Sequence, residues 1–471
     1  MEDILGLDRA VLDRARISRD PRFDGKFFIA VTSTGVYCRP VCPSRSSKSA
    51  NVRYYATAAE AAEAGFRPCL RCRPEAAPGT PAWLGTSAVV RRALRLIDDG
   101  VLDETSVDSF AASLGIGPRH LRRLFVQHVG ASPMTVARTR RVSFAKRLLD
   151  DTRLPMTHIA LAAGFRSVRR FNSAFRRIYG RAPGELRRQR GGGSVDEVIL
   201  RLAFRPPFEW GAMRDELAGR ALPGIERVDD RGYARTVATE RGHAVVRLRP
   251  LEGENALELH VSGALPGELF GLSVCARRMF DLAADPARIA LALEPDPLLG
   301  PLVRARPGLR IAGAWDPFEC AVATVLGGPA TAALVARRGR PIPGGADGLT
   351  HLFPTPQALA TADAEVPGVT LSALARAVAG GALDLGGPSD EVVAGLLRVG
   401  LDLDAAEEIA LRTLGEPDAF PTGDPVLRHV VGREAPLTAR ELAGRAEAWR
   451  PWRGYAAVHL RSAAAPASTR R

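Results

Sequence analysis

Residues 35–47 read GVYCRPVCPSRSS and residues 66–75 read FRPCLRCRPE, so four of the six cysteines of the chain lie in two close pairs. Three residues separate the cysteines of the first pair, two separate those of the second, and 26 residues separate the pairs. Zinc prefers four soft ligands in a tetrahedron, and two cysteine pairs on turns supply them while holding a small domain together. Disulfides are the alternative, and the spacing together with a reducing compartment favours zinc. The predicted zinc ligands are Cys38, Cys42, Cys69 and Cys72.

The length and composition predict a protein of several domains that stays in the cytoplasm. A chain of 471 residues suggests roughly two to four domains, and its 46% hydrophobic content lets each bury a core. No apolar run approaches the roughly 18 to 20 residues that span a bilayer. The first 20 residues, MEDILGLDRAVLDRARISRD, are charged and contain no apolar signal segment. We therefore expect a soluble, cytoplasmic protein with reduced cysteines and no membrane partner.

The positive charge of the chain is concentrated in its first part. The formal net charge is +13, but residues 1–190 hold 34 Lys and Arg against 17 Asp and Glu, which leaves 31 against 35 for residues 191–471. A surplus of this size predicts a polyanion as the partner of the first part. Nearly all the basic residues are arginines, which suit bidentate contacts with phosphate and guanine.

Breaks in composition divide the chain into four parts. A Pro/Gly linker lies at 75–82 and a Gly/Ser joint at 189–195, and strand-like alternation gives way to helical periodicity near 276–284. The predicted domains are 1–77, 84–190, 195–279 and 280–465. The predicted fold class is multidomain α+β: a small zinc domain, an all-α domain with two helix-turn-helix units, an α/β subdomain and a final all-α domain.

Local patterns place the first secondary-structure elements inside these domains. Residues 27–38 read as a strand and turn, and residues 57–66 as a short helix that Gly65 ends. The alternating stretches 198–207 and 243–251 read as strands. From about residue 281 onward, Ala- and Leu-rich helical stretches dominate.

The cysteine segment resembles a known family. GVYCRPVC, the following Asn51 and Val52, and AGFRPCLRC are similar to the N-terminal domain of Ada, with likeness over about residues 20–74. The resemblance implies that Cys38, bound to zinc as a thiolate, accepts a methyl group from a methylphosphotriester of the DNA backbone. It also implies that the other three cysteines complete the zinc site. The residues expected to contact the DNA backbone are Thr34, Arg45 and Arg67. One departure is Pro43, where the family commonly has an arginine.

The chemistry implied by the resemblance predicts a charge switch. Metal coordination keeps sulfur as the nucleophilic thiolate at neutral pH. Zn²⁺ with four thiolates carries a charge of −2, and methylation of one sulfur leaves −1. We therefore expect the affinity for DNA to rise after transfer, in a reaction that consumes the protein.

Two helix-turn-helix units are predicted in the arginine-rich segment. VDSFAASLGIGPRHLRRLFVQHVG, residues 107–130, reads as a helix, a Gly-containing turn and a second helix from Pro118, and a similar pattern recurs at 156–185, where Ser167 opens the second helix. The two units, with the closing GRAPGE, resemble the AraC-type DNA-binding domain. The expected inner face of the first unit consists of Phe110, Leu114, Leu121, Leu124 and Phe125. The outward residues expected to contact DNA in the major groove are Arg119, His120, Arg122, Arg123, Arg169 and Arg170.

From about residue 195 the chain resembles AlkA-type DNA-3-methyladenine glycosylases. The likeness rests on AWDPFECAVATVLG at 314–327, IALRTLGEPDAFPTGDPVL at 409–427 and WRPWRGYAAVHL at 449–460. The family flips a damaged base out of the duplex, stacks it on aromatic side chains and uses one aspartate to stabilise the sugar cation. That aspartate corresponds to Asp424, whose other interpretation is a helix N-cap before PVLRH.

The hairpin motif departs from the family pattern. VGLDLDAAEEIALR at 399–412 stands where the family reads like LPGIGPWTAEYIALR, and a tryptophan common after the last motif is Arg461. Two stacking aromatics at about 2 kcal/mol each correspond to roughly a thousandfold in binding. We therefore expect weak or absent glycosylase activity. The second hairpin glycine, the tryptophan and the tyrosine of the motif become Asp402, Asp404 and Glu408.

The sequence thus predicts a sensor of DNA alkylation damage that activates transcription and carries an AlkA-like domain. Its expected cofactor is zinc, and its expected partner is double-stranded DNA, both methylated backbone and promoter, with RNA polymerase as a further candidate. Two alternatives stay open: an active base-excision glycosylase with a regulatory N-terminus, and a zinc-containing transcription factor without methyl transfer. Cys275 and Cys320 lie outside any PCHR-type motif and are expected to be buried small residues.

Overall fold

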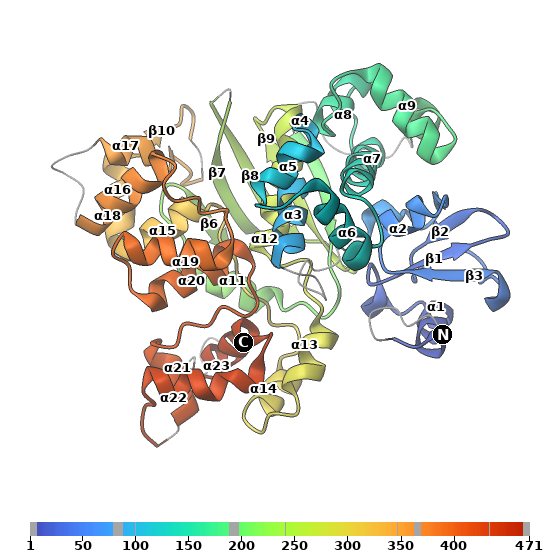
Figure 1. Cartoon of the computed structure of the whole chain (residues 1–471). Coiled ribbons are helices and arrows are strands. Elements are labelled where there is room, and N and C mark those ends of the chain that lie inside the picture. The colour runs from blue at the N-terminus through green and yellow to red at the C-terminus, as the bar shows by residue number, and fades with distance from the viewer. Residues whose placement is uncertain are drawn as a thin grey trace. The chain divides into compact units, whose positions relative to one another are not determined.

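The computed structural model describes residues 7–78, 88–98, 100–187, 197–240, 242–345, 347–361, 369–432 and 434–464 (Figure 1). Contacts divide the chain into two units, Met1–Pro206 with Leu251–Val274, and Pro207–Pro250 with Cys275–Arg471. The chain passes from the first unit to the second for the last time within α12 (Leu269–Met279). The linker predicted at 75–82 and the joint predicted at 189–195 lie largely outside the described residues.

A small four-stranded sheet carries the cysteines. Figure 1 shows β1, β2 and β3 side by side, with the strand order β3-β1-β2-β4. β1 and β2 are antiparallel, with Ile29 opposite Cys38, and β2 and β4 are parallel. The predicted strand and turn at 27–38 and the helix at 57–66 are confirmed, and Gly65 follows that helix with φ +89°. The elements are α1 (Arg9–Ser18), β1 (Phe28–Val31), β2 (Val36–Cys38), β3 (Val52–Tyr55), α2 (Ala58–Glu63) and β4 (Arg67–Pro68).

The next segment is wholly helical and contains both predicted helix-turn-helix units. Ser106 and Ser167 cap their helices by accepting a backbone N–H, and Gly130 and Gly180 end helices in the left-handed conformation. The first unit is α5 with α6 and the second is α8 with α9. The helices are α3 (Ala88–Asp98), α4 (Val101–Glu104), α5 (Val107–Ser113), α6 (Pro118–Val129), α7 (Pro133–Asp151), α8 (Met156–Ala162), α9 (Val168–Tyr179) and α10 (Pro183–Leu186).

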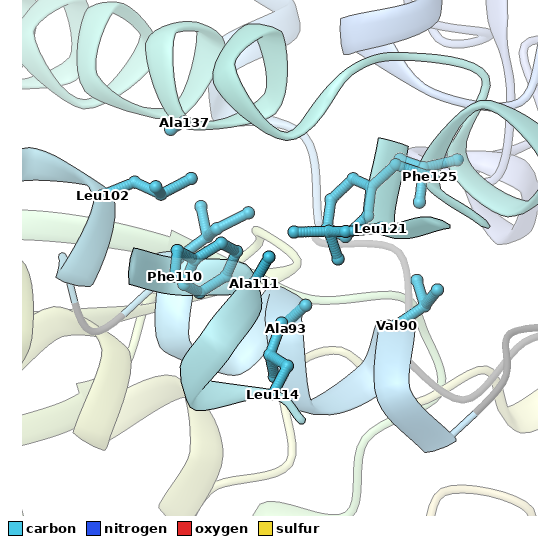
Figure 2. Close-up of a cluster of buried hydrophobic side chains, with 11 residues drawn as sticks. Val90, Ala93, Leu102, Phe110, Ala111, Leu114, Leu121, Phe125 and Ala137 are labelled. Atoms are coloured by element: carbon cyan, nitrogen blue, oxygen red, sulfur yellow. The ribbon is translucent and has the colours of Figure 1, made fainter. Parts of the chain in front are cut away.

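One apolar cluster fixes the first helix-turn-helix unit (Figure 2). Phe110 and Phe125 point into it from α5 and α6, beside Leu121, and both rings are buried. Helix α3 contributes Val90, and α7 contributes Ala137. The predicted inner face is therefore confirmed, with Leu124 only partly buried. Because this apolar face is buried, the polar residues between its members on α6 point outward.

Two further strands belong to the first unit. β5 (Glu197–Ala203) and β9 (Ala256–Ser262) pair antiparallel, with Glu197 opposite Ser262. Side chains alternate between buried and more exposed along β5, as the sequence pattern predicts.

The second unit begins with a short antiparallel meander and continues as helices. Strands β6, β7 and β8 pair in sequence order. Helices α19 and α20 are joined by a tight turn in which Gly400 has φ +97°, which gives the predicted helix-hairpin-helix. The first elements are α11 (Trp210–Ala218), β6 (Glu226–Asp229), β7 (Gly232–Thr239), β8 (Gly242–Pro250), α13 (Pro286–Leu293), α14 (Leu299–Ala305), α15 (Pro317–Leu326), α16 (Gly328–Arg338), β10 (Arg340–Pro341) and β11 (His351–Leu352). The remainder are α17 (Pro356–Ala360), α18 (Val369–Ala379), α19 (Ser389–Arg398), α20 (Leu403–Leu414), α21 (Pro425–Gly432), α22 (Ala439–Ala446) and α23 (Arg453–Ala464).

Among the described residues, no single helix is long and apolar enough to cross a membrane. The pair α15 and α16 passes that test of length and composition only when the two are taken together across a bend of 120°.

Candidate metal centre and nucleic-acid interface

The four cysteines of the two sequence pairs converge on one point. Cys38 ends β2, and Cys69 follows β4 and donates its backbone N–H to the Tyr37 carbonyl at 2.9 Å. A turn brings Cys42 back, with its N–H bonded to the Arg39 carbonyl at 3.1 Å. The four sulfur atoms lie within 4.8 Å of one another, and all are free thiols. Sulfurs around one tetrahedral zinc lie about 3.8 Å apart, so this all-sulfur donor set fits zinc.

The thiols cannot all ionise without a compensating cation. Hydrogen bonding with Cys38 lowers the pKa of Cys42 and lowers that of Cys69 to about 6. Hydrogen bonding within the cluster raises the pKa of Cys38 and of Cys72 above the ordinary thiol value. A first thiolate therefore opposes ionisation of its neighbours, and a dication at the centre removes that opposition.

Burial does not single out one sulfur as the acceptor. Cys38 and Cys72 are buried, whereas Cys42 and Cys69 are half-buried. The Cys72 sulfur accepts the Arg39 backbone N–H at 3.3 Å, which makes it a weaker nucleophile. The role of Cys38 as acceptor therefore continues to rest on the sequence resemblance.

Polar and basic residues around the thiols fall into two groups, those exposed for contact with DNA and one that has a structural role. The predicted backbone contacts Thr34, Arg45 and Arg67 are exposed. Arg39, which the sequence analysis did not select, instead pairs with Asp24 and donates to the Cys72 carbonyl at 3.1 Å. Arg39 is thus a structural residue that holds the second cysteine turn.

The exposed faces of the two helix-turn-helix units are basic. Arg123 lies 2.9 Å from Nδ1 of His120 on α6, one turn away along the helix. Leu121 and Phe125 of the same helix point into the core. On α9, Phe171 and Phe175 are buried in the same way. The six residues predicted to contact DNA are all exposed: Arg119, His120, Arg122, Arg123, Arg169 and Arg170.

A buried ion cluster joins the zinc domain to α7. Arg73, directly after Cys72, pairs with Asp150 and with Asp151, each at 2.9 Å. Lys146 is only 1% exposed, pairs with Asp150 and lies 3.8 Å from Glu75. Burial raises the pKa of Glu75, which marks the cost of enclosing its charge. Sequence reasoning missed this cluster, because the pairs that join the zinc domain to α7, Arg73 with Asp150 and Lys146 with Glu75, are more than 70 positions apart.

The second unit contains a different charged cluster, around Asp424. Its Oδ1 accepts the backbone N–H groups of Val426 and Leu427 at 2.7 and 3.2 Å, so it caps α21. Its Oδ2 lies 2.6 Å from a guanidinium nitrogen of Arg461, which also contacts Glu408 at 2.8 Å. The helix-cap interpretation of Asp424 is thus observed, together with an ion pair that the sequence did not indicate.

The other two acidic residues of the hairpin motif have local structural roles. Asp402 caps α20 by accepting the Ala405 N–H at 2.7 Å, and Asp404 accepts the Gly423 N–H at 2.5 Å. Asp402 is exposed at the turn between α19 and α20, at the position of a hairpin glycine in the family. Cys320 is buried as expected, but Cys275 is half-buried, so that expectation was wrong for Cys275.

The structure and its sites define a zinc-thiolate DNA-binding protein that continues into a helix-hairpin-helix domain of the glycosylase class. Family models match three segments: the metal binding domain of Ada at residues 12–75, a helix-turn-helix domain at 110–189, and the AlkA N-terminal domain at 199–316.

Curated relatives extend these matches over nearly the whole chain. A probable bifunctional transcriptional activator/DNA repair enzyme AlkA of Mycobacterium tuberculosis is 40% identical over 95% of both chains. The bifunctional transcriptional activator/DNA repair enzyme Ada of Escherichia coli is 39% identical over 25% of this chain and 32% of its own length. DNA-3-methyladenine glycosylase 2 of Escherichia coli is 31% identical over 55% of this chain and 95% of its own. The chain belongs to the family of bifunctional transcriptional activator/DNA repair enzymes of the AlkA type.

The sulfur cluster predicts one tightly held zinc per chain. Cys42→Ser is expected to remove most of the metal, because three thiolates no longer close the tetrahedron. Elemental analysis of purified protein checks this, with Cys320→Ser as the matched control because that buried thiol lies outside the cluster. Equal zinc in the two variants would contradict the assignment.

The ion cluster predicts that Lys146 stabilises the joint between the zinc domain and α7. Lys146→Met removes a cation from two buried carboxylates, which is expected to cost about 3–5 kcal/mol. Calorimetry of the zinc-loaded chain, with hydrogen exchange of α7, measures the loss. Lys48→Met, at an exposed lysine, is the control. Equal free energies of unfolding in the two variants would contradict a stabilising role of the cluster.

Proposed function

We propose that this chain senses methylation of the DNA backbone through Cys38 and then activates transcription through its two helix-turn-helix units. The observation that carries the proposal is the convergence of four thiols in a domain matched by the Ada metal-binding model, with two exposed basic helices in the same unit. The domain division at 1–77, 84–190, 195–279 and 280–465 is part of this proposal.

The transfer step needs only the thiolate and the phosphotriester. The Cys38 sulfur attacks the methyl carbon, a sulfur–carbon bond forms and the carbon–oxygen bond breaks. The electron pair stays on the phosphate oxygen, which becomes an ordinary anionic phosphodiester. Zinc, when bound, keeps the four sulfurs as thiolates at neutral pH. Thr34, Arg45 and Arg67 hold the DNA backbone against the sulfur.

Methylation changes the force between the cluster and DNA. The net charge of the cluster changes from −2 to −1. Each nearby phosphate is therefore repelled by one negative charge fewer. At about 8 Å that repulsion is about 0.5 kcal/mol in water and about 2 kcal/mol at an effective dielectric constant of 20. Since about 1.4 kcal/mol is tenfold in affinity, the gain for each such phosphate lies between about twofold and about thirtyfold.

The partners follow from the same surfaces. Double-stranded DNA is bound both as damaged backbone and as promoter, and RNA polymerase is the partner that an activator at a promoter would recruit. A function on DNA supports a cytoplasmic location, where the thiols would stay reduced.

Cys38→Ser tests the switch. It is expected to abolish methyl transfer and the methylation-dependent gain in promoter affinity, while affinity of the unmethylated protein persists. Intact-mass measurement and peptide mapping after incubation with methylated DNA locate the adduct, with Cys69→Ser as the comparison at a more exposed ligand. An adduct on another cysteine would identify that residue as the methyl acceptor. The absence of any adduct would favour a zinc-containing transcription factor without methyl transfer.

Base release is the second candidate function. Asp424 stands at the start of α21, after the α19–α20 hairpin, in a chain that covers 95% of a DNA-3-methyladenine glycosylase. We propose that any base release is weak, since Asp404 and Glu408 occupy two expected stacking positions and the Asp424 carboxylate is ion-paired.

Asp424→Asn tests the second function directly. The asparagine keeps the size and much of the capping geometry but removes the charge that stabilises a sugar cation. Release of 3-methyladenine from duplex DNA is expected to be slow in the parent chain and to disappear in the variant. Release at the same rate in both proteins would exclude Asp424 as the catalytic residue.

A further inference from the structure

Arg461 gathers two carboxylates from separate helices. It lies on α23, and its guanidinium contacts Glu408 of α20 at 2.8 Å and Asp424 before α21 at 2.6 Å. All three side chains are at most 30% exposed, so water screens the pairs only in part. Burial acts against charge on Glu408, yet the guanidinium groups of Arg412 and Arg461 hold its pKa below the usual range.

The two oxygens of Asp424 have different partners. Oδ1 accepts two backbone N–H groups of the first turn of α21. Oδ2 faces the guanidinium, with Nε of Arg461 also at 2.8 Å. A carboxylate held in this way offers little net negative charge to a third, cationic group.

Glu408 does not depend on Arg461 alone. Nε of Arg412, one turn along α20, lies 2.5 Å from Glu408, so that carboxylate keeps a cation if Arg461 is removed. Asp424 would keep its two backbone donors and lose the one side-chain cation that pairs with it among the described residues. Removal of Arg461 therefore exposes the charge of one carboxylate, that of Asp424.

The space beside Arg461 is lined by charges of both signs. A cavity of about 250 Å³ is lined by Glu408, Arg461 and neighbouring residues. Its charged lining consists of Arg306, Arg310, Arg412 and Arg461 against Asp215, Glu216 and Glu408. Asp424 is not among the residues that line this cavity, and Arg306 pairs with Glu209 outside the lining, so the argument for masking rests on the pairing of Asp424 with Arg461.

We infer that Arg461 is a masking residue that neutralises Asp424 and removes the preference of this site for a cation at the sugar position. The inference rests on the second candidate function, because it takes Asp424 as the group that faces the sugar. It is independent of methyl transfer at Cys38. Arg461 acts through Asp424 and is thus a positioning residue.

The test compares two duplexes that carry abasic analogues of the same shape. One contains a pyrrolidine, which is cationic at neutral pH, and the other a neutral tetrahydrofuran. The ratio of the two dissociation constants reports the charge at the sugar position, and the general loss of DNA affinity that follows removal of an arginine cancels in it. The full zinc-loaded chain is used.

The parent chain is expected to bind the two duplexes within about twofold of each other. Arg461→Ala is expected to prefer the pyrrolidine at least tenfold, and the double variant Arg461→Ala/Asp424→Asn to lose that preference. Arg461→Gln, which keeps hydrogen-bonding capacity without charge, should behave like Arg461→Ala and guards against misfolding of one variant. Arg450→Ala is the matched control, because this arginine is more exposed and pairs with Asp418 and Glu447 instead.

Two results would overturn the inference: a parent chain that already prefers the cation, or arginine variants that show no preference. Base release is measured in parallel. A cation preference without base release would support masking and count against the glycosylase function, so the two can fail separately.

Discussion

Four sulfur atoms within 4.8 Å of one another cannot all be anionic unless a cation lies among them. This constraint governs the first domain, whose strands are two to four residues long and whose apolar clusters are small. A core of that size supplies little stability by itself, and natural domains of this kind rely on a metal. The centre that would make Cys38 reactive is therefore also the centre that holds its domain together. A reaction at the Cys38 sulfur would therefore modify a ligand of the metal centre that stabilises the domain.

Buried charged groups also lie close together at two other places in the structure. Behind Cys72, Arg73 enters a buried cluster with α7, so the last cysteine turn and a central helix of the DNA-binding segment share ion partners. Around Asp424, Arg461 and Arg412 together compensate two carboxylates. Buried ion pairs add little net stability but are costly to break singly, so both clusters fix geometry more than they add free energy.

Local features of the sequence predicted most of the fold. Helix boundaries followed from Pro118 and Ser167, which act within one turn of themselves. The cysteine spacing predicted the cluster, since each pair lies on one turn. The ion pairs were not predictable, because Lys146 meets Glu75 across 71 positions and Arg461 meets Glu408 across 53. An isolated charged residue in a sequence predicts a solvated surface position, and only the fold reveals its partner.

The pairing of Arg461 with Glu408 changes how the departures from the glycosylase pattern should be understood. Taken from the sequence alone, a glutamate and an arginine at two aromatic positions are two separate losses of stacking surface. In the fold they are in contact, at 2.8 Å. Each member also has a second partner, since Arg412 pairs with Glu408 and Asp424 pairs with Arg461. The two positions therefore form one electrostatic unit, to which Asp424 is attached as the third member. An aromatic residue restored at position 461 alone would leave Glu408 paired with Arg412 but would take the guanidinium from Asp424, whereas one restored at position 408 alone would leave Arg461 paired with Asp424.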